Sequence, residues 1–260
     1  MLIDVVFTPN TVPVINGDHD IAIIIDVLRA STTMCSFLHH GASEIHIASS
    51  IDNARQMYSK RVTLSNQSSQ SAQGPLNIER MLLAGEQRGL APEGFELGNS
   101  PLEVVNSNVR NCSVVYATTN GTRMLQLTNT AKFQFVGCFA NVTSLLDTIV
   151  DVQQHLPSNA KLLLCCSGNN GAFSLEDTFF AGRFLSRYIA NGFGHDLTNA
   201  AEAALCIVSS YNQTLSAGFS CTRHARTLAS LSLSCDVEVC FTEDLYPVVP
   251  VCENLVVRRL

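Results

Sequence analysis

The stretch IAIIIDVLRASTTMCSFLHHG, residues 21–41, predicts the kind of sheet on which this chain is built. Its first five residues are apolar and mostly β-branched, which predicts a strand buried on both faces, as in a parallel sheet. Apolar residues later recur at helical spacing up to Gly41, and polar residues stand between the two patterns, namely Asp26, Arg29, Ser31, Thr32 and Thr33. The stretch therefore predicts a strand, a polar turn and a helix. Because ligands of open α/β sheets bind beyond the carboxyl ends of the strands, we expect this turn to face a ligand.

Few charged residues accompany a large apolar fraction in this chain of 260 residues. Hydrophobic residues make up 46%, enough for a sizeable core, whereas charged residues make up only 15%, against roughly 25% in an average soluble domain. The net charge of −6 argues against a nucleic-acid binder, which normally presents a basic face. We therefore expect no nucleic-acid partner, and we expect part of the weakly charged surface to be buried in a homodimer.

The sequence predicts neither a secretory signal nor a membrane span. The N-terminal segment has no basic region and carries Asp4, and no apolar run approaches the roughly 18 residues of a membrane helix. We therefore expect a cytoplasmic protein that does not bind a membrane. The expected state of its ten cysteines is the buried free thiol, because most of them lie in apolar surroundings, as do Cys35, Cys138, Cys165, Cys166 and Cys206.

Strand-like and helical segments alternate along the chain, which predicts one α/β domain over residues 1–260. The expected strands cover residues 2–7, 21–25, 44–48, 81–84, 113–117, 133–136 and 162–166, and the expected helices begin near residues 34, 51, 122, 141 and 174. We expect a three-layer α/β/α fold with a mainly parallel or mixed sheet, either compact or divided into two lobes around the site. We also expect the polar tract 66–74, NQSSQSAQG, to be an exposed loop, and the apolar run 248–257 to be an edge strand interrupted by Pro250.

A second polar turn follows the expected strand 113–117. Its sequence TTNGTR, residues 118–123, combines hydroxyls, an Asn-Gly pair, the start of a helix and an arginine. The free N–H groups of such a turn suit phosphate or sulfonate oxygens, which makes candidate anion-binding residues of Thr119, Asn120, Gly121, Thr122 and Arg123. Taken alone, the motif is explained slightly better as a tight turn with a threonine cap. The similar residues 29–33, at the end of another strand, favour an anion site.

Four acidic residues stand where a cation would be held beside an anionic ligand. Asp26 closes a strand, Glu86 lies in the Gly-rich loop 85–101, and the first turn of a helix holds Glu176 and Asp177. Mg²⁺ prefers oxygen ligands and keeps several waters, so a few carboxylates are enough to hold it. Helix capping is the alternative explanation for Glu176 and Asp177. Asp26 needs a partner because it closes an apolar strand, and Arg29 is one candidate.

Two further motifs are weaker candidates for the site. The loop 168–171, GNNG, resembles a phosphate loop only loosely, so we expect it to line the site at most. His224 is a weaker functional candidate, because such a histidine more often belongs to the surface of a helix.

Several segments together resemble the 2-phosphosulfolactate phosphatase family in their order and spacing. They are IDVLRASTT, LLAGE, PEGFELGNSP, ATTNGTR and SLEDTFFAG, followed near the end by Asp236, Cys240 and Asp244. The resemblance covers nearly the whole chain. It implies a Mg²⁺-dependent phosphatase that converts 2-phospho-3-sulfolactate to 3-sulfolactate and phosphate, a step of coenzyme M biosynthesis in methanogens. The chain departs from the family where ASTT, residues 30–33, replaces ATTT, where GEQRG, residues 85–89, replaces GERGG, and where RHA, residues 223–225, stands at a common His-Gly.

The residues and the resemblance lead to one hypothesis for the mechanism. The expected catalytic residues are Asp26, Arg29 and Glu86, and the expected holders of Mg²⁺ beside a small phosphorylated substrate are Asp26 and Glu86, helped by Glu176 or Asp177. Arg29, residues 31–33 and residues 119–123 are expected to bind the anionic groups. Aspartyl-phosphate chemistry is not indicated at Asp26, because Val and Leu follow it in place of D-x-D. The alternative is a non-catalytic binder or sensor of a small phosphorylated or sulfonated acid.

Overall fold

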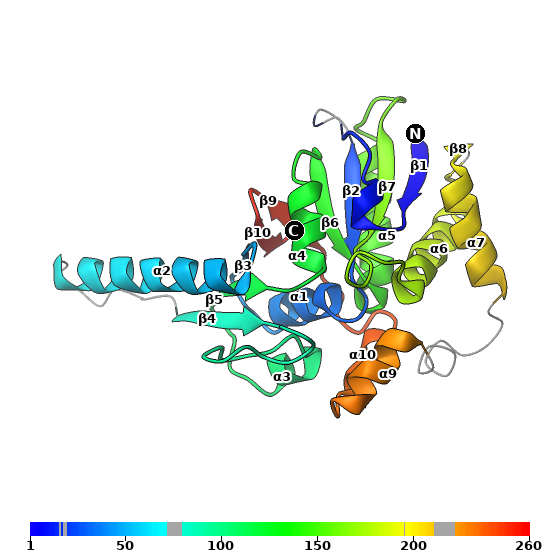
Figure 1. Cartoon of the computed structure of the whole chain (residues 1–260). Helices are drawn as coiled ribbons and strands as arrows, with labels where there is room; N and C mark the ends of the chain where they lie inside the picture. Colours follow the sequence, from blue (N-terminus) through cyan, green and yellow to red (C-terminus); the bar gives the residue numbers. More distant parts are fainter. Residues whose placement is uncertain (16, 18–19, 72–79, 195, 211–221) are drawn as a thin grey trace.

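Ten strands form one mixed sheet in the described part of the chain (Figure 1). The computed structural model describes all residues except 16, 18–19, 72–79, 195 and 211–221, and for residues 62–71 it describes the backbone alone. The strands are, in chain order, β1 Leu2–Val6, β2 Ile21–Ile25, β3 Glu44–Ile47, β4 Arg80–Gly85, β5 Cys112–Ala117, β6 Phe133–Gly137, β7 Lys161–Cys166, β8 Asp196–Leu197, β9 Pro250–Glu253 and β10 Val256–Arg259. Their order across the sheet is β4-β5-β3-β10-β9-β6-β2-β7-β1-β8.

The sheet consists of two parallel halves joined by a hairpin. β4, β5 and β3 form one half, and β6, β2, β7, β1 and β8 form the other. The β9–β10 hairpin pairs antiparallel with β6 and β3, so the two halves run in opposite directions. The prediction of an edge strand over residues 248–257 was therefore wrong. Pro250 is tolerated there because it stands at the first position of β9, where a strand accepts a missing N–H.

β2 lies inside the second half, between β6 and β7. All five of its residues are fully buried, so the prediction of a strand covered on both faces is confirmed. Each of these side chains is removed from water on one face or the other, which explains why the run is apolar without alternation.

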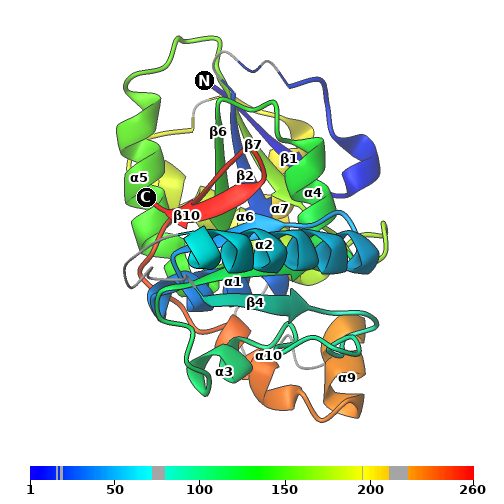
Figure 2. The ribbon, with the colours of Figure 1, turned by 90° about the vertical axis from the view of Figure 1, so that its left-hand side faces the viewer.

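Helices cover both faces of this sheet (Figures 1 and 2). The helices α5 Val142–Gln153, α6 Leu175–Ala190 and α7 Asn199–Ser210 pack on one face around a phenylalanine-rich core. The other face carries α1 Ala30–His39, α3 Pro101–Val105 and α4 Gly121–Leu127. The predicted three-layer α/β/α fold with a mixed sheet is confirmed.

The helix α2, Ile51–Ser71, is longer than the sequence suggests and packs on β4 and β5. Residues 66–71 are helical, so the prediction of a loop was wrong for this part of the tract, while residues 72–74 lie outside the described residues. Serine and glutamine do not end a helix as glycine and proline do, and the first glycine here is Gly74. None of the described helices has both the length and the apolar character to cross a membrane.

Two short helices, α9 Arg223–Ser230 and α10 Ser234–Cys240, pack on each other, and α10 also packs on α3. Two single-turn helices complete the described elements, η1 Pro9–Thr11 and η2 Phe139–Asn141. Four of the thiols expected to be buried are so, but Cys206 is exposed on α7. An apolar neighbourhood in sequence did not reveal that this position lies on the outer face of its helix.

Candidate active site

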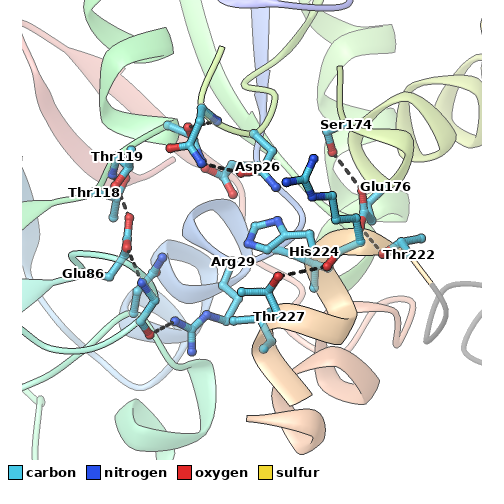
Figure 3. Close-up of a pocket in the computed structure, with 18 of the residues that line it drawn as sticks. Asp26, Arg29, Glu86, Thr118, Thr119, Ser174, Glu176, Thr222, His224 and Thr227 are labelled. Atoms are coloured by element: carbon cyan, nitrogen blue, oxygen red, sulfur yellow. Dashed lines mark hydrogen bonds between the residues drawn. The ribbon is translucent and has the colours of Figure 1, made fainter. Parts of the chain in front are cut away.

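A cleft of about 860 Å³ lies where loops from both halves of the sheet meet (Figure 3). Asp26 follows β2, Glu86 follows β4 and Thr118 follows β5, and all three line the cleft. Figure 1 shows β4 lying crosswise to the upright β2, β6 and β7, which explains how the carboxyl ends of two opposed halves reach one place. The loop before α6 and the helix α9 supply the remaining walls.

Asp26 lines the cleft although it is only 5% exposed. Its Oδ1 accepts a hydrogen bond from the N–H of Ala30 at 3.2 Å, and its own N–H donates to Ser31 Oγ at 2.9 Å. Burial, helped by the charge of Glu86, raises the pKa of Asp26 to about 7, against the opposing effect of the Ala30 N–H. A cation beside this carboxylate would offset the cost of its burial.

Glu86 joins the Gly-rich loop to the turn after β5. Its Oε1 accepts a hydrogen bond from the N–H of Thr119 at 2.8 Å, and its Oε2 accepts one from the N–H of Gly89 at 2.8 Å. The preceding Gly85 has a φ of +151°, and a Cβ there would lie 2.0 Å from the carbonyl oxygen of Ala117. Only glycine therefore allows β4 and β5 to bring Glu86 to this position.

The guanidinium of Arg29 is buried in an ion pair with Asp236, so the predicted candidate partner Asp26 is not its partner. Arg29 Nη1 donates to Asp236 Oδ2 at 2.6 Å, and Nη2 donates to the carbonyl oxygen of Gly89 at 2.6 Å. Asp236 also accepts a hydrogen bond from Ser100 Oγ at 2.6 Å. Arg29 does line the cleft, but its two terminal nitrogens hold α10 and the Gly-rich loop in place.

The hydroxyls of the first turn face the protein interior and do not line the cleft. Ser31, Thr32 and Thr33 are fully buried. Their hydroxyls donate to the backbone carbonyls of Ile24, Val27 and Asn99, respectively. This corrects the expectation that they contact a ligand, because α1 begins at Ala30 and turns these side chains toward the core.

The turn after β5 is divided between the cleft and its surroundings. Thr119 and Asn120 line the cleft as predicted, but Gly121 and Thr122 are buried outside it. The guanidinium of Arg123 is also outside the cleft lining, and its Nη2 donates to Asn10 Oδ1 at 3.2 Å. Two of the five residues predicted to bind an anion therefore line the cleft, and the anion-binding role itself stays a prediction.

The acidic pair at the start of α6 serves two different purposes. Asp177 is absent from the cleft lining, and its carboxylate accepts hydrogen bonds from the N–H groups of Val27 and Gly168 at 2.9 and 3.0 Å. Burial raises the pKa of Asp177 well above its usual range, and the charge of Asp26 adds to this effect. Glu176 does line the cleft, where it accepts a hydrogen bond from Thr222 Oγ1 (Figure 3).

The helix α9 places residues in the cleft that the sequence did not single out or ranked low. Thr222, Arg223 and His224 lie at its start and line the cleft together with Arg88 from the Gly-rich loop. Burial lowers the pKa of His224, and the charge of Glu176 partly opposes this. The first turn of α9 has two basic side chains and no acidic one, which is unusual at the positive end of a helix and is the sequence signal that could have indicated this wall.

The carboxylates of the cleft fit a hard divalent cation. The carboxylates of Asp26 and Glu86 could supply oxygen ligands. The hydroxyl of Ser167, outside the cleft lining, is fully buried and has no hydrogen-bond partner among the residues that the structure describes. Ser167 follows β7 directly, beside the end of β2. No three histidine, cysteine or acidic side chains group as a metal site within the described residues. A Mg²⁺ ion bound here would therefore keep several of its waters and would also be coordinated by oxygen atoms of an anionic molecule in the cleft, as is usual for Mg²⁺.

The spacing C-x5-R of cysteine phosphatases occurs at Cys252 and Arg258. These residues lie in β9 and β10, in the hairpin at the middle of the sheet, and neither lines the cleft. Cys252 is 5% exposed, and burial raises the pKa of its thiol to about 12. Such a thiol carries no nucleophilic thiolate near neutral pH, so cysteine phosphatase chemistry is not indicated.

Fold and site define this chain as a three-layer α/β protein with a carboxylate-bearing cleft at the carboxyl ends of its strands. Residues 6–255 match the family model described as 2-phosphosulpholactate phosphatase. The chain belongs to the 2-phosphosulfolactate phosphatase family, which confirms the resemblance of its motifs.

Several relatives share most of their length with this chain, and each carries the name probable 2-phosphosulfolactate phosphatase. The protein of Thermotoga petrophila is 34% identical over 233 residues, which cover 90% of this chain and 89% of the relative. The protein of a Cyanothece species is 32% identical, with 96% of both chains covered. The protein of Clostridium beijerinckii is 27% identical, again with 96% of both chains covered.

Proposed function

We propose that this protein is a Mg²⁺-dependent phosphatase that hydrolyses 2-phospho-3-sulfolactate to 3-sulfolactate and phosphate. The observation that carries the proposal is the meeting of Asp26 and Glu86 with Arg88, Arg223 and His224 in one cleft. Acidic residues that hold a cation, next to basic residues, suit a small molecule with several negative charges. The family and the names of the relatives support the choice of substrate.

In this proposal some residues of the cleft bind the cation and others bind the substrate. Asp26 and Glu86 hold the Mg²⁺, and Glu176 is a further candidate ligand. Bound Mg²⁺ supplies positive charge to a phosphoryl oxygen and to the attacking water. Thr119 and Asn120 orient the phosphate with hydrogen bonds. Arg29 acts indirectly, because it fixes the loop that carries Glu86.

The test of this function is phosphate release from 2-phospho-3-sulfolactate, with Mg²⁺ and with EDTA. We expect turnover only with Mg²⁺, and we expect Asp26→Asn to lower kcat/KM by about 100-fold or more, the usual loss when charge stabilisation is removed. Asp52→Asn, on the exposed first turn of α2, is the matched control and should keep wild-type activity. A panel of other phosphorylated 2-hydroxy acids then measures selectivity.

Two results would contradict the proposal. Full Mg²⁺-dependent turnover by Asp26→Asn would remove this residue from the mechanism. Binding of the substrate without turnover, by the wild type and with Mg²⁺ present, would favour the binder or sensor. The homodimer, the cytoplasmic location and a place in coenzyme M biosynthesis stay predictions.

A further inference from the structure

We infer that Arg223 binds the anionic group of the substrate that is not the phosphate, a sulfonate or a carboxylate. This inference rests on the proposed function and names the side chain that selects an acidic phosphate ester over a neutral one. It follows from the distribution of charge in the cleft and from the way in which α9 is held.

Three arginines line the cleft, but their guanidinium groups are not equally free. Arg29 is committed to Asp236 and to the carbonyl oxygen of Gly89. Arg88 and Arg223 have exposed side chains, and neither guanidinium forms an ion pair or a hydrogen bond within the part of the chain that the structure describes. These two are therefore the arginines available to a ligand.

The position of Arg223 suits the far end of the substrate. Figure 3 shows Glu86 and Thr119 on one side of the cleft, and Glu176 with Thr222 on the opposite side. Arg88 belongs to the loop that Glu86 anchors, on the side of Thr119, which is assigned to the phosphate. Arg223 directly follows Thr222, so its backbone lies on the opposite wall, and its side chain extends into the cleft from there. A second anionic group of the substrate finds its countercharge there.

The start of α9 is held in place before any ligand binds. Thr222 caps the helix, because its Oγ1 accepts a hydrogen bond from the N–H of Ala225 at 3.2 Å. The same hydroxyl donates to Glu176, which also accepts from Ser174 Oγ at 3.1 Å. These contacts join the N-termini of α6 and α9, so Arg223 is presented from a fixed position and less ordering is needed on binding.

The dipole of α9 also favours an anion beside Arg223. Arg223 is the first residue of α9 and His224 the second, and no acidic side chain lies in this turn. Positive side chains at the positive end of a helix are unfavourable, whereas an anion there is favourable. Glu176, which accepts from Thr222, already places one negative charge at this helix end. A sulfonate or carboxylate bound to Arg223 would reduce the remaining repulsion and complete a charge-assisted hydrogen bond.

The test measures binding of the product 3-sulfolactate by calorimetry to the wild type, Arg223→Gln, Arg223→Lys and Arg226→Gln. Arg226 is the matched control, because it is an exposed arginine one turn along the same helix and does not line the cleft. We expect Arg223→Gln to weaken binding by about tenfold or more, as for the loss of a charge-assisted hydrogen bond, and Arg226→Gln to change it less than about twofold. The affinity of Arg223→Lys should lie between these two values, because lysine keeps the positive charge but cannot donate the two parallel hydrogen bonds of a guanidinium.

Lactate and 2-hydroxyethanesulfonate separate the two possible partners of Arg223. If Arg223 binds the sulfonate, Arg223→Gln weakens the binding of 2-hydroxyethanesulfonate and leaves the binding of lactate unchanged. If Arg223 binds the carboxylate, the variant weakens the binding of lactate and leaves that of 2-hydroxyethanesulfonate unchanged. Equal losses for Arg223→Gln and Arg226→Gln would overturn the inference while the proposed function stands. A wild type that neither binds 3-sulfolactate nor releases phosphate would overturn the proposed function and this inference with it.

Discussion

The ion pair of Arg29 and Asp236 lies inside the protein, with 3% and 2% of the two side chains exposed. It joins the residue that precedes α1 to α10, more than 200 residues further along the chain. Both charges are almost fully removed from water, so each depends mainly on the other and on the hydrogen bonds from Ser100 and to Gly89. Removing one partner therefore leaves an uncompensated buried charge.

We predict that Asp236→Ala lowers the free energy of unfolding by about 3–5 kcal/mol, the usual cost of breaking a buried pair. The double variant Arg29→Met with Asp236→Leu should lose less than Asp236→Ala, because it leaves no buried charge. Denaturant unfolding of the wild type and of both variants measures these differences. The control is Asp52→Ala, which breaks an exposed pair with Arg55 and should cost less than about 1 kcal/mol. An equal cost for both single variants would contradict the prediction.

At the scale of elements, β3, β10 and α2 meet in a cluster of charged side chains. His46 of β3 is 3% exposed, and its Nε2 contacts both Glu44 and the guanidinium of Arg61. Arg258 of β10 also pairs with Glu44. Burial lowers the pKa of His46, the charge of Arg61 adds to this, and Glu44 opposes it. The neutral imidazole is therefore the form that the fold favours.

This cluster predicts a pH dependence of stability. The pKa of His46 is lower in the folded protein than its ordinary value of 6.5. The stabilisation that the neutral imidazole gives the folded state is therefore fully present above pH 6.5, and it is lost as the pH falls from 6.5 through the lowered pKa. One such group changes the free energy of unfolding by at most about 1.4 kcal/mol for each pH unit. We expect His46→Gln to reduce the difference between the free energies of unfolding at pH 7 and at pH 5, both measured by denaturant unfolding. A variant with the slope of the wild type would exclude this histidine as the cause.

For the molecule as a whole, the cleft is the place where loops from the two opposed halves of the sheet meet. Asp26 follows β2 of one half, and Glu86 follows β4 of the other. A cation held by both residues would link the halves directly. Ligands that bind only the folded state stabilise it in proportion to the logarithm of their excess over Kd.

We therefore predict that Mg²⁺ raises the unfolding temperature relative to EDTA. At a hundredfold excess over Kd the gain in the free energy of unfolding is about 2.7 kcal/mol. Asp26→Asn should remove most of this gain, and potassium chloride at equal ionic strength should not reproduce it. Calorimetry of the wild type and the variant measures both effects. The same gain in Asp26→Asn would show that the ion binds elsewhere.

The sequence by itself determined the class of fold and the neighbourhood of the site. Apolar runs such as residues 21–25 specify buried strands, and the polar turns after them are placed by topology at the carboxyl ends of strands. Asp26, Glu86, Thr119 and Asn120 were predicted in this way and do line one cleft. The position of β9 and β10 was not predictable, because strand pairing depends on partners far along the chain.

Only the tertiary structure decided which polar side chains face the cleft and which pair inside the protein. Ser31, Thr32 and Thr33 resemble ligand-binding residues in sequence, yet the start of α1 turns them inward. Arg29 is committed to Asp236, whereas the guanidinium of Arg223 has no ion pair or hydrogen bond with any residue that the structure describes. Residue types and local spacing are properties of the chain, but the direction of a side chain and its partner depend on the packing of distant elements.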